Sequence, residues 1–287
     1  MGVCRKRRTT LTDGVSMFAR WLFAVFPREM LRGWRLVRAD AFFWGSLACA
    51  LALVGAMYDP DTATSTDTQA PAPLLLSLLA TVARVVLFPI VLVIASLRFA
   101  ASSEERASSW SDVLSTVMQR ALPALGEWIL AAGLSAAIAA LAATGTGSVV
   151  SMVTTDEDVL ALLIGVVRTA VFIACMVRFA FVPFLIALER HDELFALRGS
   201  RGAVSDAVFR FAWPLSVSNR LTASLRWRLL PYIVLGIYAP AAAGQVPDAW
   251  QAVASVVLHL VAFTALAVLF QYYAERRGAL APRPSSV

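Results

Sequence analysis

The apolar residues of this chain are gathered into long runs, separated by polar and charged connectors. Their length matches the ~20 helical residues that cross ~30 Å of hydrocarbon. Blocks such as residues 160–167 do not alternate apolar and polar positions, as strands of a membrane barrel do. The pattern therefore predicts α-helices, because a helix satisfies its backbone hydrogen bonds within one segment.

The runs predict an all-α, polytopic transmembrane helical bundle with about six spans and additional amphipathic interface helices. The predicted spans are residues 41–58, 74–97, 122–143, 160–182, 229–243 and 249–273. The expected organisation is a disordered basic N-terminus (1–16, or a true start at Met17), an interface helix (17–40), a six-span domain (41–273) and a cytoplasmic tail (274–287).

Positive charge is distributed on one side of this arrangement. Of the 25 Lys and Arg residues, 22 lie in the N-terminal segment, in connectors 98–121 and 183–228 and in the C-terminal tail. The other connectors hold none. The positive-inside rule then predicts a multi-pass protein with both termini in the cytoplasm. The first 16 residues are too polar for a signal peptide. A bacterial inner membrane is the expected location.

Residues 17–40 combine an apolar face with a basic one. Trp21, Leu22, Val25 and Phe26 recur at helical spacing, whereas Arg28, Arg32 and Arg35 share the opposite face. This composition is typical of a helix in the membrane interface, with arginines toward anionic lipid. A juxtamembrane helix packed on the bundle is an equal alternative, and the two can coexist.

Several smaller expectations follow from local composition. Amphipathic helices are predicted around 110–121 and 204–211, with breaks or turns at Pro123 and Pro214. The TGTGS segment at 144–148 is expected to be a flexible turn. Aromatic residues near the span ends are expected to anchor the chain in the membrane interface. They are Trp44, Tyr58, Tyr232, Trp250, Tyr272 and Tyr273.

Composition and the absence of known motifs argue against several classes of function. Of the 287 residues, 59% are apolar and 15% charged, which also favours a membrane protein. The net charge of +6 is spread along the spans rather than forming a patch, so we expect no nucleic acid as partner. Three cysteines without CxxC spacing and two distant histidines predict no metal site. No cofactor motif or catalytic residue set is found, so the chain is not expected to be an enzyme.

Ionisable residues inside the predicted spans are the candidate binding groups, because each is costly in lipid. Arg84, Arg168 and His259 fall at similar depth near the bilayer midplane at ~1.5 Å rise per residue. Together they could line a polar cavity for an anionic ligand. The alternative is structural, with arginines snorkelling or bonding carbonyls and the histidine bonding a neighbouring helix. Glu127 and Arg178, nearer the cytoplasmic boundary, are predicted to form an ion pair between spans three and four.

Short motifs across most of the chain resemble a known family. They are REMLRGWRLVRADAFFWGSL, VRFAFVPFLIALERHDELFALRGSRGAV and LFQYYAERRG, with Pro183, Glu189, Ala196, Leu197 and Ser200 as the matching positions. The chain thereby resembles the membrane domain of glycerophosphodiester phosphodiesterases and the YciC-like membrane proteins. The resemblance implies a six-span module without its own chemistry. The phosphodiesterase domain sometimes fused to that module is absent from this sequence.

Two function hypotheses follow. The preferred one is a non-enzymatic scaffold or assembly module, whose partners are membrane lipids, above all anionic ones, and another membrane protein. The alternative is a transporter of a small anionic solute or lipid with a midplane Arg/His site, built on a parallel three-plus-three repeat.

Overall fold

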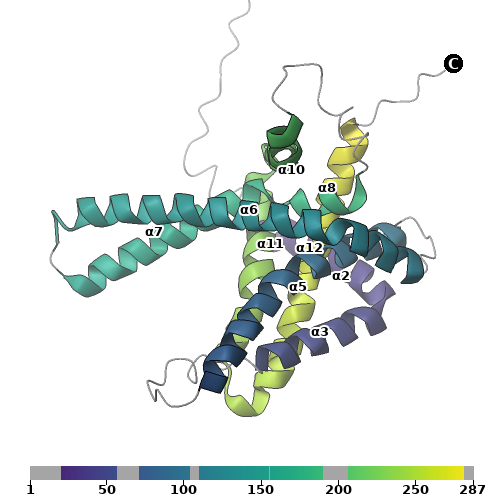
Figure 1. The fold of residues 1–287 in the computed structure, drawn as a ribbon, viewed down its shortest axis with the longest axis horizontal. Helices are drawn as coiled ribbons and strands as arrows, with labels where there is room; N and C mark the ends of the chain where they lie inside the picture. Colours follow the sequence, from purple (N-terminus) through teal and green to yellow (C-terminus); the bar gives the residue numbers. More distant parts are fainter. Residues whose placement is uncertain (1–20, 57–70, 104–109, 155, 190–205, 281–287) are drawn as a thin grey trace, which may run out of the picture.

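The computed structural model describes residues 21–56, 71–103, 110–154, 156–189 and 206–280 (Figure 1). Every regular element in these ranges is helical, which confirms the all-α prediction. The elements are the π-helix η1 (Trp21–Val25), α2 (Phe26–Ala39), α3 (Ala41–Ala56), α5 (Pro71–Ser103), α6 (Trp110–Val150), α7 (Glu157–Arg178), α8 (Val182–Leu188), α10 (Asp206–Thr222), α11 (Arg226–Tyr238), the 3₁₀ helix η2 (Pro240–Gln245) and α12 (Asp248–Leu280). Residues 1–16 lie outside the described ranges.

Three helical stretches in this part of the chain are long and apolar enough to cross a membrane, namely Ser111–Val150, Glu157–Leu188 and Ala249–Gly278. A fourth candidate is the pair Phe23–Ala39 and Ala41–Gly55, which bends by 95°. The structure is thus that of a helical membrane protein with three to four candidate spans.

The bend between α2 and α3 lies at Asp40. Its backbone leaves the helical region, with φ −132° and ψ 51°, and its carboxylate accepts from Arg98 of α5. Arg98 also lies over the ring of Phe43, with 5.4 Å between the guanidinium carbon and the ring centroid. The ion pair between Asp40 and Arg98 therefore holds the bend between α2 and α3 against α5.

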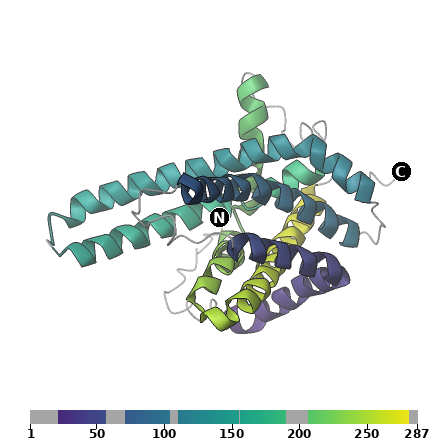
Figure 2. The ribbon, with the colours of Figure 1, turned by 60° about the horizontal axis from the view of Figure 1, so that its bottom comes forward.

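Helices α6 and α7 form a long antiparallel hairpin that projects from the other helices (Figures 1 and 2). The predicted flexible turn at 144–148 is wrong, because α6 continues to Val150. Thr144 and Thr146 donate to the carbonyl oxygens four residues earlier, so these polar side chains are satisfied inside the helix. The connection ends at Asp156, whose carboxylate accepts from the amides of Asp158 and Val159 and caps α7.

The predicted breaks at Pro123 and Pro214 are also wrong, since both prolines lie inside continuous helices, α6 and α10. The predicted amphipathic helix at 110–121 is therefore the first part of α6 rather than a separate element. Of the apolar residues on which this prediction rested, Val113 and Val117 are buried, whereas Leu114 is 54% exposed. Neighbouring helices and local adjustments make prolines tolerable in membrane helices.

The break that does occur lies between α7 and α8, at residues 179–181. The hydroxyl of Ser218 in α10 accepts from the amide of Phe181 at 3.1 Å and donates to the carbonyl oxygen of Arg178 at 2.8 Å. Thr222 donates to the same carbonyl at 3.3 Å. Two fully buried hydroxyl groups thus replace the hydrogen bonds that the broken helix loses.

The main core joins α2, α3, α5, α8, α10, α11 and α12, and the last turn of α7 adds Met176 and Val177 to it. Stacked aromatic rings fill it: the ring centroids of Trp44 and Phe99 lie 4.6 Å apart, and those of Phe184 and Tyr273 lie 5.5 Å apart. Because Trp44 is only 1% exposed, it packs inside the protein. Its predicted role as an interfacial anchor is wrong.

Candidate membrane-surface site

Helix α2 is held on α12 by a close contact at Gly33. A Cβ atom added at Gly33 would lie 2.6 Å from the carbonyl oxygen of Thr264 and 2.7 Å from Cγ2 of Val268. Such distances are far inside van der Waals contact, so only glycine fits. The backbones of α2 and α12 therefore approach each other more closely than any other residue would permit.

A carboxylate on the same side of α2 binds two tyrosines of the bundle. Glu29 accepts hydrogen bonds from the hydroxyl groups of Tyr232 in α11 and Tyr272 in α12, the latter at 2.6 Å. The ring of Tyr232 also stacks on Phe26, with centroids 5.4 Å apart. Both tyrosines are buried, so their predicted role as interfacial anchors is wrong. They position α2 instead.

The outer side of α2 carries the predicted basic face. Arg28, Arg32 and Arg35 are all exposed, and so are Leu31 and Trp34 between them. The inner side packs on the bundle through Gly33 and Val37. The alternative of a helix packed on the bundle is therefore confirmed for α2, and its arginines remain free to meet another charged surface.

A second carboxylate lies at the same end of α12. Glu189 follows α8, is 4% exposed, and accepts from the hydroxyl of Tyr273 and from Nη2 of Arg277 at 3.0 Å. Nη1 of Arg120 donates to its backbone carbonyl at 2.9 Å. Tyr273 is 1% exposed, so it too packs in the core rather than in an aromatic belt.

The three candidate cavity residues are placed as follows. Arg168 is exposed on α7, which packs against α6 and α11. His259 is half-buried in α12, and its Nδ1 donates to the carbonyl oxygen of Ser255 at 2.7 Å. The side chain of Arg84 falls outside the described part of the chain. A cavity shared by all three stays a prediction.

The predicted Glu127–Arg178 ion pair is not formed between these described residues. Glu127 is 4% exposed and its Oε2 has no hydrogen-bond partner, whereas Arg178 is exposed at the end of α7. The sequence correctly suggested neither contact nor orientation; it only placed Glu127 and Arg178 near the cytoplasmic boundary of the predicted spans three and four. The break after Arg178, however, directs the chain into α8 and does not bring its guanidinium to the carboxylate.

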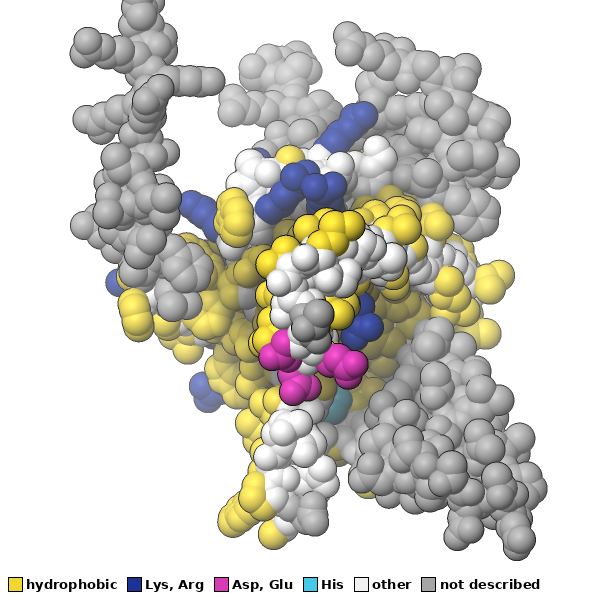
Figure 3. Space-filling model, turned by 90° about the vertical axis from the view of Figure 1, so that its left-hand side faces the viewer, with side chains coloured by type: hydrophobic (Ala, Val, Ile, Leu, Met, Phe, Trp, Pro, Cys, Tyr) yellow, Lys and Arg dark blue, Asp and Glu magenta, His cyan; other side chains and the backbone are white. Residues whose placement is uncertain are grey.

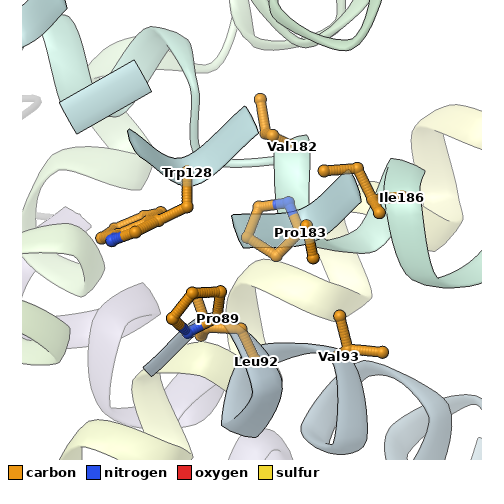
Figure 4. Close-up of a pocket in the computed structure, with 8 residues that line it drawn as sticks. Pro89, Leu92, Val93, Trp128, Val182, Pro183 and Ile186 are labelled. Carbon is orange, nitrogen blue, oxygen red and sulfur yellow. The ribbon is translucent and has the colours of Figure 1, made fainter. Parts of the chain in front are cut away.

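A small pocket lies between α5, α6 and α8 (Figure 4). Its walls are Pro89, Leu92, Val93, Ala124, Trp128, Val182, Pro183 and Ile186. All eight lining residues are hydrophobic and none carries a charge, so this pocket offers no ionic partner for an anion.

The described ranges hold no cluster of three or more His, Cys, Asp or Glu residues that could bind a metal ion. The positioning roles of Glu29 and Glu189 were not predicted from the sequence. Glu29 gave a signal, because it is an isolated acid beside an apolar run, whereas Glu189 begins the charged segment ERHDE and does not stand out. The tyrosines that bind them lie far away in sequence, so the pairing itself had no local signature.

These features define a helical membrane protein with a basic helix docked on its bundle. Comparisons with protein-family models, with curated proteins and with solved structures found no match. The resemblance to the glycerophosphodiester phosphodiesterase membrane domain and the YciC-like proteins therefore stays an expectation that rests on its motifs alone.

Proposed function

We propose that this chain is a non-enzymatic scaffold or assembly module of the inner membrane, whose helix α2 binds anionic lipid at the cytoplasmic surface. The observation that carries the proposal is the 95° bend between the basic helix α2 and the apolar helix α3. If α3 lies along the membrane normal, α2 lies in the plane of the headgroups. The exposed Arg28, Arg32 and Arg35 then meet lipid phosphates.

The docking of α2 supports this orientation. Gly33 and Glu29 fix one side of the helix to α12 and α11, so the arginine side is held outward. Leu31 and Trp34 are exposed beside the arginines and suit the boundary between headgroups and acyl chains. A rigidly held basic surface binds without first ordering a free helix.

The finer topology belongs to the same proposal. About six spans, with both termini in the cytoplasm, would put α2, the connector after α5 and the chain between α8 and α11 on one membrane face. The distribution of Lys and Arg supports this arrangement. The apolar sequences of α3, α5 and α11 support the three spans beyond the long candidates.

Native mass spectrometry of the purified full chain tests the proposal. The protein is loaded with equal amounts of phosphatidylglycerol and phosphatidylethanolamine, and retained lipids are counted. Replacing Arg28, Arg32 and Arg35 together by Gln should weaken phosphatidylglycerol binding roughly a hundredfold, at about 1 kcal/mol per arginine.

The matched control replaces Arg178, Arg220 and Arg228 by Gln, because these arginines are also exposed but lie outside α2. This variant should keep most of the bound phosphatidylglycerol. Equal losses in both variants would mean that total charge, rather than α2, attracts the lipid. Unchanged retention in the α2 variant would also refute the proposal.

A further inference from the structure

The arginine in the middle of α7 is exposed in an otherwise apolar helix. Arg168 lies eleven residues after Glu157 and ten before Arg178, which are the two charged ends of α7. At ~1.5 Å per residue it is therefore ~15 Å from either end. Among the described residues it forms no hydrogen bond or ion pair, and Val166 and Leu162 nearby are also exposed.

Arg168 lies on the side of α7 that turns toward the bundle. Gly165, Phe172 and Cys175 share this side at spacings of three and four residues. Farther along, Phe172 packs on the main core and Cys175 is buried. Arg168, one turn before Phe172, is exposed, so the same side of α7 is open at this position. A Cβ added at Gly165 would meet nothing within 4 Å.

An anionic neighbour would stabilise a cation at this depth, because a charged side chain at the bilayer centre is costly. The acidic residues at the hairpin tip, Asp156, Glu157 and Asp158, are exposed about 15 Å away (Figure 3). A lipid headgroup at either membrane surface would also lie about 15 Å from Arg168. The nearest anion of suitable depth would therefore come from within the membrane.

A second copy of this chain does not supply that anion. Copies inserted with the same topology would place Arg168 beside Arg168 at equal depth, which is repulsive. The one acidic residue in the six sequence-predicted spans is Glu127, and it is buried in its own protein. Charge complementarity thus favours a different protein.

We propose that the open side of α7 around Arg168 and Gly165 binds a transmembrane helix of a partner protein that carries an Asp or Glu near its middle. The small residues Ala161 and Gly165 let the partner backbone approach, and Arg168 pairs with its carboxylate. This inference rests on the proposed function as an assembly module and names the chemistry of its partner.

A defined probe replaces the unidentified partner in the test. Two 22-residue Leu/Ala transmembrane peptides, identical except for a central Asp or a central Leu, are labelled with a fluorescence acceptor. The full chain carries a donor at its C-terminus. Energy transfer is measured in phosphatidylcholine vesicles, which contain no anionic lipid. The Asp peptide should bind the wild type about fivefold more tightly than the Leu peptide.

Variants of the arginine decide the outcome. Arg168→Leu should remove the preference for Asp, Arg168→Lys should keep much of it, and Arg178→Leu, at the end of α7, should leave it unchanged. A preference that is absent in the wild type, or that persists in Arg168→Leu, would overturn the inference. So would displacement of the Asp peptide by added phosphatidylglycerol, since a lipid headgroup would then be the ligand of Arg168.

This test is separate from that of α2. Because the vesicles lack anionic lipid, the peptide preference should survive replacement of Arg28, Arg32 and Arg35 by Gln. Loss of peptide binding with intact phosphatidylglycerol retention would refute the partner helix alone. The reverse result would refute the lipid surface alone.

Discussion

The bundle around α12 and the outer part of the α6–α7 hairpin differ in how several of their polar side chains are bound. In the bundle, side chains of different helices bind one another, as Glu29 binds Tyr232 and Tyr272. In the hairpin, Ser135, Thr144 and Thr146 donate to carbonyl oxygens four residues earlier in their own helix. Contacts between side chains of different helices therefore help to specify the bundle, whereas these three hydroxyl groups of the hairpin are satisfied within their own helix.

Burial follows the same division. Glu189 and Tyr273 are nearly inaccessible at the α8–α12 contact, while Leu141, Leu162 and Val166 of the hairpin are more than half exposed. Locally satisfied helices with apolar surfaces can face lipid or another membrane helix. We infer that the bundle determines the shape of the protein and that the hairpin presents surface to its surroundings.

The largest expected effect comes from removing a carboxylate of the bundle. Glu189→Ala deletes the acceptor for Tyr273 and Arg277 at a buried contact, which should lower the free energy of unfolding by about 2 to 3 kcal/mol. SDS titration of the purified protein in mixed micelles measures it. The control is Glu157→Ala, an exposed acid of the hairpin, which should change stability by about 0.5 kcal/mol or less. Equal effects would erase the proposed difference between the two regions.

A glycine in each region gives the next effect, with opposite sign. Gly33→Ala forces a Cβ against the backbone of Thr264 and should cost about 1 to 3 kcal/mol. Gly133→Ala in α6 meets open space and should stabilise by about 0.5 to 1 kcal/mol through helix propensity. Thermal unfolding in detergent distinguishes them. If Gly33→Ala left the melting temperature unchanged, the docking of α2 on α12 would be wrong.

The helices themselves could be predicted from the sequence because apolar runs and basic flanks are local signals. The exposure of Arg28, Arg32 and Arg35 on one face of α2 followed from spacing alone. The C-terminal end of α6 could not be predicted in this way. The TGTGS segment is typical of a turn, but its hydroxyl groups bond inside the helix. Glycine and proline predict turns less well inside a membrane than in soluble proteins. Lipid offers no water to bind the backbone groups that a turn exposes, so a continuous helix is favoured.

The positioning contacts could not be predicted, because they join residues far apart in the chain. Ser218 replaces the lost bonds of a helix break some 40 positions earlier. Glu29 binds Tyr272 across 243 positions. One sequence supplies the chemistry of such groups but not their pairing. The sequence therefore predicted Tyr232, Tyr272 and Tyr273 as membrane anchors, whereas in the fold they bind Glu29 and Glu189.

The most local effect tests whether the hairpin unfolds independently. Asp156 caps α7 by accepting from two backbone amides at the tip, so Asp156→Ala should cost about 1 kcal/mol. The hydroxyl groups near the tip of the hairpin bond within their own helix, so the destabilisation caused by Asp156→Ala should stay near the tip. Hydrogen exchange should speed up in the first turns of α7 and remain unchanged in α12. Asp112→Ala, an exposed acid in the first turn of α6 at the other end of the hairpin, is the control. Faster exchange throughout α12 in the Asp156 variant would show one cooperative unit, and the division between bundle and hairpin would fail.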